Sequence, residues 1–355
     1  MKLFKFSSLF LVALLISCAS GPTKTGQSGI DTPAFLYYQH ALTSLEQGNY
    51  QRALAQMDTA ISLRKEFAQF HYVRGQILEL LGRRSDAIKA YEISLNYKSH
   101  FPEAWRNLAT LYLQSAQYEK AVQVLKELTE DLPDSLRFEL LLAEAYVRNE
   151  QPLLALDFVR SYEKQGGKSP ETFLIRGLAY FQQEDFPRAM NQLDKFVQKK
   201  PQNFEAQKYL GIACIKSGAL EKGISHLNDA LKINPDDPII YLYRARYFLQ
   251  RQKYATAADQ LNAALNLDAN NSEILLEISK FALMKKDTVR AQTALEMALN
   301  ADDECWECYK LLGIIADDQG HHFEALLYLQ KYLSNIYTKD PDAEERLNRL
   351  RQINQ

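Results

Sequence analysis

The sequence predicts an all-α protein, a right-handed solenoid of about nine helical hairpins followed by a capping helix. One pattern of small and large apolar residues recurs every 34 residues and runs without a gap from Ala34 to Lys339. Proline-containing turns separate many of the units, where they can end one helix and begin the next. The two-residue alternation typical of strands fails across the whole frame. These observations predict helices throughout residues 34–339.

The chain begins with a short apolar segment that predicts export. Lys2 and Lys5 precede eight consecutive apolar residues, Leu9–Ile16. A helix that spans a bilayer needs about 20 residues, so this layout favours a secretory signal peptide. The stretch Leu15-Ile16-Ser17-Cys18 resembles the bacterial lipoprotein signal. That resemblance implies cleavage after residue 17, a diacylglycerol on the Cys18 thiol and often an acyl chain, such as palmitate, on its amine. The alternative is an ordinary signal peptide with an unrelated cysteine.

The same resemblance implies a location in the bacterial cell envelope. Two or three acyl chains anchor a protein stably, whereas one holds it marginally. Ala19 rather than aspartate follows Cys18, which implies an outer-membrane lipoprotein facing the periplasm. Residues 18–33 contain many small and turn-forming side chains, too few apolar ones to fold. We expect the lipidated cysteine and a flexible tether with a reach of about 20 Å.

Two positions of the 34-residue frame hold small residues in every unit, eighteen in all. Two helices approach to about 8–10 Å only where their side chains are small, so these positions predict the contact within each hairpin. Bulkier apolar residues fill position 24 and much of position 11. The small residues are Ala41, Gly75, Ala109, Ala143, Gly177, Gly211, Ala245, Ser279 and Gly313 at position 8, and Ala53, Ala87, Ala121, Ala155, Ala189, Gly223, Ala257, Ala291 and Ala325 at position 20.

The third unit shows the pattern most fully, with Trp105, Leu108, Ala109, Tyr112, Ala121, Leu125 and Pro133. This pattern resembles the tetratricopeptide repeat family, and the resemblance covers residues 34–339. It implies stacked helix–turn–helix units with a concave face that binds protein partners. The fourth unit departs from the pattern, because Gly166 and Gly167 stand where proline is usual. We expect that junction to be bent or loosely packed.

Residues 340–355 predict a C-terminal capping helix. Asp340 can cap it, Pro341 can begin it, and Leu347 and Leu350 share one face with Ile353. A solenoid exposes its last apolar face unless such a helix covers it.

Composition argues against nucleic acid as a partner. The chain has 42 Lys and Arg against 44 Asp and Glu, whereas a groove built for nucleic acid should be markedly basic. The six histidines form no catalytic motif, and we find no phosphate loop or nucleophile elbow. We therefore expect no enzymatic activity, no catalytic residues and no cofactor.

Cys305 and Cys308 leave several readings open. A zinc site with His321 and His322 is disfavoured, because thirteen residues of helix put Cys308 and His321 about 20 Å apart, and we expect no metal. A disulfide between Cys305 and Cys308 suits an oxidising compartment. Two reduced cysteines and a redox-active pair are the other options. Cys214 is expected to fill core space.

The family resemblance places positions 2, 5, 9, 12 and 13 of each unit on the concave face. In units four to eight these positions form an apolar stripe interspersed with cations, which predicts a groove for an amphipathic helix or extended peptide with aliphatic anchors and an acidic flank. The alternative is that part of the stripe, position 12 above all, is core. The predicted groove residues are Leu140, Leu174, Leu178, Phe181, Lys208, Ile212, Ile215, Leu242, Arg246, Leu249, Leu276 and Lys280.

Tether and repeats together predict a membrane-anchored interaction scaffold that assists assembly of an envelope complex. The combination resembles proteins that assist type IV pilus secretin assembly, and a secretion system is equally compatible. A second reading is an adaptor that presents peptidoglycan hydrolases to a protease. A redox or hydrolytic enzyme is the reading that the residues favour least. The sequence is also compatible with a homodimer.

Overall fold

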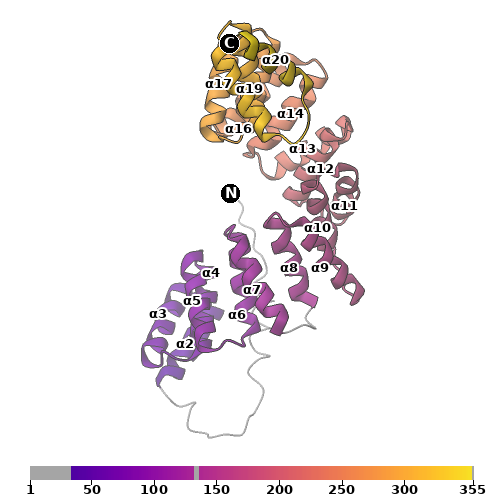
Figure 1. The fold of residues 1–355 in the computed structure, drawn as a ribbon. Helices are drawn as coiled ribbons and strands as arrows, with labels where there is room; N and C mark the ends of the chain where they lie inside the picture. Colours follow the sequence, from indigo (N-terminus) through magenta and orange to yellow (C-terminus); the bar gives the residue numbers. More distant parts are fainter. Residues whose placement is uncertain (1–32, 132–135, 354–355) are drawn as a thin grey trace. The chain divides into compact units, whose positions relative to one another are not determined.

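The computed structural model describes residues 33–131 and 136–353. The predicted signal peptide, Cys18 and nearly all of the predicted tether lie outside these residues. Nineteen helices fill the described part, arranged as nine successive pairs and one last helix. The all-α prediction is thus confirmed (Figure 1). None of these helices combines the length and the apolar character that crossing a membrane requires.

The helices form two compact units, which divide between Lys168 and Ser169. This division follows directly on Gly166 and Gly167. Unit 1 contains α2 (Pro33–Glu46), α3 (Tyr50–Leu63), α4 (Ala68–Leu80), α5 (Arg84–Tyr97), α6 (Pro102–Gln114), α7 (Tyr118–Asp131), α8 (Leu136–Arg148) and α9 (Pro152–Lys164). Unit 2 contains α10 (Glu171–Gln182), α11 (Phe186–Lys199), α12 (Phe204–Lys216), α13 (Leu220–Ile233), α14 (Pro238–Gln250), α15 (Tyr254–Leu267), α16 (Ser272–Met284), α17 (Thr288–Ala301), α18 (Trp306–Asp318), α19 (His322–Asn335) and α20 (Pro341–Ile353).

The small residues at positions 8 and 20 are buried in all nine pairs, as predicted. Gly211 shows why they must be small. A Cβ atom added there would lie 2.7 Å from Cδ2 of Leu227 and 3.0 Å from its backbone nitrogen. At Gly177 the same atom would lie 2.6 Å from Cγ of Leu193. The two helices of each pair can therefore lie this close only because the residues at their contact have small side chains or none.

The turn inside every pair uses one left-handed residue at the same place in the frame, position 15. Its φ lies between 55° and 80° in all nine pairs. A positive φ costs a residue with a Cβ atom about 1 kcal/mol or more, whereas glycine adopts it freely. Four of the nine positions carry glycine, and the others are Ala116, Glu150, Glu184, Gln252 and Lys286. The left-handed conformation thus occurs at this position even in the five pairs whose residue has a Cβ atom that disfavours it.

Helix α20 covers the end of unit 2, as the sequence predicts. Ala343, Leu347 and Leu350 are buried against the last pair, α18 and α19. Asp317 at the end of α18 holds α20 electrostatically, because Arg346 donates to its carboxylate at 3.1 Å and Arg349 donates to the same oxygen. The first turn of α20 contains acids and the last turn contains an arginine, and charges placed in this way interact favourably with the helix dipole. The apolar end of the stack is therefore closed.

Candidate protein-interaction surface

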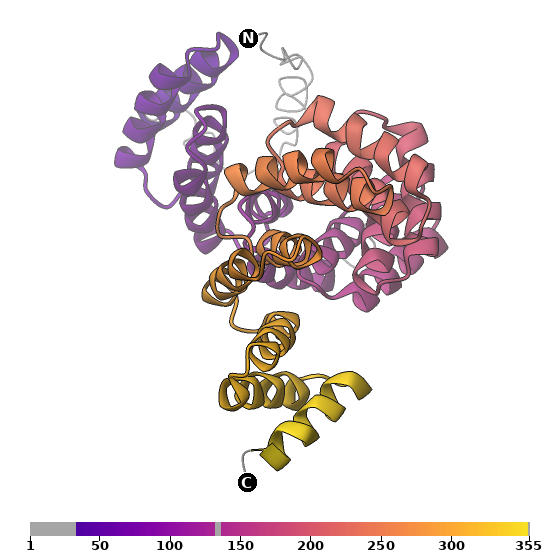
Figure 2. The ribbon, with the colours of Figure 1, turned by 90° about the horizontal axis from the view of Figure 1, so that it is seen from above.

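The first helices of the pairs in unit 2 form its inner face. Helices α10, α12, α14 and α16 contact one another in succession, and no two second helices of neighbouring pairs contact as extensively. Figure 2 shows these pairs following one another from α10 to the capping helix α20. A stack whose first helices lie closer together than its second helices curves toward the first, so the surface of α10, α12, α14, α16 and α18 is the concave one.

Ion pairs join the first helices α12, α14, α16 and α18 to the beginning of the helix that starts the next pair, or of α20, along this inner face. Lys208 on α12 pairs with Asp237 at 2.7 Å, and Asp237 also caps α14 by accepting from two backbone N–H groups. Further along, Lys280 on α16 lies 3.6 Å from Glu307, and Lys310 on α18 lies 2.7 Å from Asp340. We call this series, together with the pairs of Arg246, the inner-face ladder.

Arg246 on α14 is the member of the ladder that pairs with two carboxylates. Its Nε donates to Glu277 at 2.7 Å and its Nη1 donates to Glu273 at 2.9 Å, both on α16. Burial by itself lowers the pKa of Arg246, but the two carboxylates outweigh it and hold the pKa above its ordinary value. Glu277 is itself buried. Arg246 therefore serves the contact between α14 and α16 and is charge-balanced without a ligand.

Four predicted anchors are buried, although one of them, Ile215, also lines a surface depression. Leu242 is fully buried, and Leu178, Ile212 and Ile215 expose 6% or less of their area. They pack in the clusters between successive pairs, as Leu242 does against Ile274 and Ile278. Positions 5, 9 and 12 therefore belong partly to the core, since the next pair covers them, and at position 12 this is the alternative that the sequence left open. The reading of these residues as partner contacts is not supported by their burial.

The other predicted apolar residues are partly exposed, namely Leu140 on α8 of unit 1 and Leu174, Phe181, Leu249 and Leu276 on unit 2. Leu249 lines an open depression of about 310 Å³ on the inner face. Its other lining residues come from α12, α14 and α16: Ile215, Lys216, Tyr243, Arg246, Gln250 and Glu277. The depression combines apolar walls with exposed polar ends at Lys216 and Gln250. It can accept one aliphatic side chain and hydrogen bonds from its backbone.

The cysteines of α18 are joined in the structure by a disulfide between Cys305 and Cys308. Cys308 is fully buried beside Leu275 and Leu312, and Cys305 stands at the N-cap of the helix. Cys214 is free and buried, and burial raises the pKa of its thiol to about 11. Among the described residues, no three His, Cys, Asp or Glu side chains are grouped as metal ligands.

Sequence reasoning missed the acidic partners of the groove cations, Asp237, Glu273 and Glu277. The separation in sequence between each cation and its acid could have indicated these pairs. These acids follow their cations by 27 to 31 residues, slightly less than one 34-residue unit. In a stacked hairpin this separation places a cation in the middle of one first helix beside an acid near the start of the next. Such a pair indicates packing between units rather than a ligand site.

Comparisons with known proteins agree with this architecture. Two tetratricopeptide repeat family models match residues 81–145 and residues 38–100, 176–238 and 223–274. A TPR repeat-containing protein of Methanocaldococcus jannaschii is 24% identical over 210 residues, which are 56% of this chain. A DnaJ homolog subfamily C member 7 homolog of Schizosaccharomyces pombe is 26% identical over 170 residues, 43% of this chain. The chain spans 36% of the length of each of these two relatives.

Solved structures with low identity share the fold. The APC/C hetero-tetramer Cut9–Hcn1 aligns over 91% of this chain and 78% of that chain, with a TM-score of 0.57 and 14% identity. The human IFIT1 dimer with PPP-AAAA aligns over 84% of this chain and 82% of that chain, with a TM-score of 0.53 and 16% identity. From the matched repeats and the nine helix pairs we conclude that the chain belongs to the tetratricopeptide repeat family and is a protein-interaction scaffold.

Proposed function

We propose that the chain is a lipid-anchored scaffold of the bacterial cell envelope that holds a segment of a partner protein on the inner face of unit 2 and so assists assembly of a pilus or secretion complex. The observation that carries the binding part is the depression beside Leu249, with the partly exposed Leu276 on the neighbouring helix α16 and Leu174 on α10. The lipoprotein-like segment ending in Cys18 supports the anchoring part.

The inner-face ladder constrains the chemistry of the partner. Lys208 and Arg246 are largely buried and already form ion pairs with carboxylates of this chain. An acidic flank of a partner would have to displace those carboxylates. Lys280 has the longest pair of the three predicted groove cations and is 41% exposed. We therefore expect binding through aliphatic anchors, with at most one acidic contact, at Lys280. An aliphatic side chain buried in such a site contributes about 1.5–3 kcal/mol.

Replacing Leu249 and Leu276 with serine together is expected to lower partner capture at least tenfold, because both aliphatic contacts are lost. Capture is measured by crosslinking in intact cells followed by mass spectrometry of the purified chain. The matched control replaces Leu267 and Ile233 with serine, since these exposed aliphatic residues lie on the second helices α15 and α13. Circular dichroism checks that both variants stay helical. Equal capture by both variants would place the binding surface elsewhere.

The anchor has its own test. Cys18→Ala removes the sulfur that carries the lipid, so a high-salt wash, which weakens attraction between charges, should release the full-length variant from the membrane fraction, whereas Cys214→Ala should be retained as the unchanged chain is. Recovery of both variants with membranes after this wash would overturn the anchoring proposal and leave the groove proposal untouched. The proteins captured by the anchored chain then separate a pilus or secretion component from a peptidoglycan hydrolase.

A further inference from the structure

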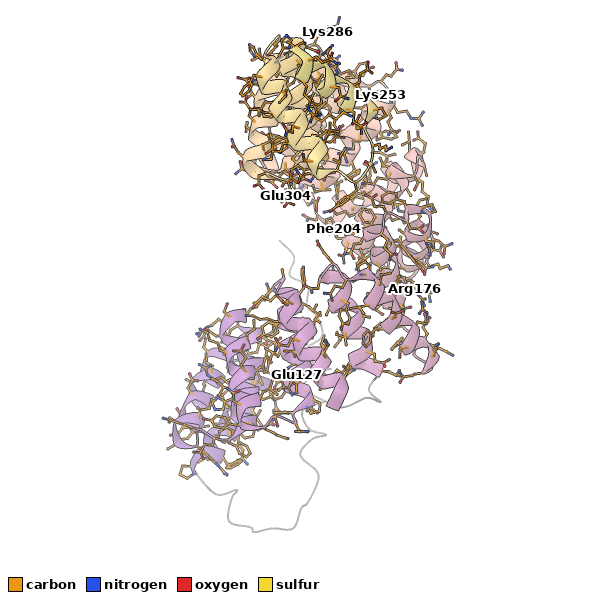
Figure 3. All side chains as sticks on the ribbon, in the orientation of Figure 1. Glu127, Arg176, Phe204, Lys253, Lys286 and Glu304 are labelled. Carbon is orange, nitrogen blue, oxygen red and sulfur yellow. A yellow bond between two sulfur atoms is a disulfide. The ribbon has the colours of Figure 1, made fainter. Side chains whose placement is uncertain are left out.

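From α12 to α20 the two edges of unit 2 differ in charge. From α12 to α19 the turns within pairs lie on one edge, which we call the turn edge: residues 216–222, 250–254, 284–290 and 318–324. The turn of the first pair, between α10 and α11, is not part of this surface, because Glu184 and Asp185 make it acidic. The first three turns of the turn edge contain seven Lys and Arg residues and two acids. The connections between pairs, residues 234–237, 268–273, 302–307 and 339–345, contain twelve acids and one lysine. Figure 3 shows Lys253 and Lys286 at one margin of unit 2 and Glu304 at the opposite one.

Contacts between neighbouring pairs make the turn edge continuous. Each contact joins a cation at the end of a first helix to the start of the preceding second helix. Lys216 lies 5.1 Å from the ring of Phe186, and Lys285 lies 4.4 Å from the ring of Tyr254. Between them, Arg251 donates to Glu221. Successive turns thus form one row, and its cations are held at a regular spacing while remaining exposed to solvent.

Large apolar side chains stand along the same edge. Val289 is 78% exposed, Phe323 is 65% exposed and Met284 is 48% exposed. They lie at the ends of α16, α17 and α19 that face the turn edge. The fourth turn contains two acids, of which Asp318 accepts from Arg346 at 3.2 Å, so the four turns together hold seven Lys and Arg residues against four acids. The edge therefore presents exposed apolar tips and an excess of cations, which belong to its first three turns.

We propose that the turn edge of unit 2 docks on an anionic lipid surface. Lysine and arginine side chains near such a surface are attracted to its headgroups, and apolar tips between them can enter the boundary of the acyl chains. A row of protruding turns suits a flat, laterally mobile surface better than it suits one folded acidic ligand. The proposal rests on the membrane location proposed above, but the edge contains neither Cys18 nor the groove residues. Docking would hold unit 2 beside the membrane that the lipid anchor reaches.

The test uses the full chain with Cys18→Ser, so that no acyl chain contributes. Co-sedimentation is measured with vesicles of phosphatidylcholine alone and with vesicles that also contain phosphatidylglycerol. We expect binding to the mixed vesicles that weakens as salt is raised, and much weaker binding to the neutral vesicles. Equal binding to both kinds of vesicle would overturn the proposal, because attraction to anionic headgroups would then contribute nothing. The apolar segment before Cys18 could by itself account for binding to both kinds of vesicle.

Two charge-matched variants locate the surface. Lys253→Glu with Lys286→Glu reverses two charges on the turn edge and should lower binding to the mixed vesicles at least tenfold. Lys232→Glu with Lys339→Glu makes the same change in net charge away from that edge and should leave binding within about twofold. An equal loss in both would show that net charge alone matters. Crosslinking of Lys253 to an acidic protein in cells, with unchanged vesicle binding by the turn-edge variant, would also overturn the proposal.

A third variant separates docking from stability. Lys286 has φ of 61°, so Lys286→Gly should raise the thermal stability of unit 2 while it weakens vesicle binding. Val289→Ser with Phe323→Ser should weaken binding without changing net charge. Full vesicle binding by both of these variants would contradict the docking surface drawn here.

Discussion

Gly211→Val is expected to lower the free energy of unfolding of unit 2 by about 3 kcal/mol or more. The new side chain has no space, since even a Cβ atom would lie 2.7 Å from Leu227 Cδ2 and 3.0 Å from the backbone nitrogen of that residue. The leucine tip can rotate, but the backbone of α13 cannot retreat without opening the pair. Because Leu227 is fully buried between α12 and the next pair, the disturbance passes to α14.

The two tryptophans allow this loss to be measured in one unit. Trp105 lies on α6 of unit 1 and Trp306 on α18 of unit 2. Fluorescence of a Trp105→Phe background therefore follows denaturant unfolding of unit 2. Gly218→Ala is the matched control, because nothing lies within 4 Å of its added Cβ and only the positive φ opposes it, at about 1 kcal/mol. A loss as large in the control as in Gly211→Val would show that close helix contact is not the cause.

Leu350→Asp is expected to release α20 and make the chain associate through the exposed end of unit 2. Leu350 is fully buried among Tyr309, Leu329 and Leu347, and a carboxylate cannot be left there without a partner. Loss of this contact removes about 3 kcal/mol or more of docking free energy. Arg346 and Arg349 still reach the buried carboxylate of Asp317, but these pairs do not replace the lost apolar contact or neutralise a carboxylate buried at position 350.

The consequence is measured by light scattering and by binding of a hydrophobic dye. Asn348→Asp adds the same charge on the exposed side of α20 and should change neither. The pairing of α18 with α19 should survive in both variants, so circular dichroism should fall by no more than the share of one helix. A monomeric Leu350→Asp chain without added dye binding would mean that α20 is not needed to close the stack.

Residue volume at fixed positions made the fold predictable. Ala53 and Gly211 have different helix propensities, yet each must be small because the two helices of its pair lie close together there. The same need for a small residue recurs in every unit. The burial of Leu242 was not predictable in the same way. Its exposure depends on how closely α16 approaches α14, which is set by Ile274 and Ile278 one unit later. A register assigns a face to a residue but does not say how far the next unit covers that face.

The ion-pair partners of the inner-face cations were also not predicted from the sequence. Lys208 and Arg246 were predicted as groove cations because they lie on the inner face, and they do lie there. Their role is decided by Asp237, Glu273 and Glu277, which belong to the following unit. Spacing by nearly one unit could have revealed these pairs. The disulfide was one of several open alternatives for Cys305 and Cys308, because its formation depends on where the first turn of α18 begins.

The most direct test of the central claim is a photo-crosslinking scan across unit 2 in living cells. A crosslinking residue is placed at position 249 or 276 on the inner face, or at position 267 on the second helix α15. Binding of a partner segment on the inner face predicts a protein adduct from positions 249 and 276 and none from position 267. Adducts from position 267 alone, or equally from all three positions, would contradict it.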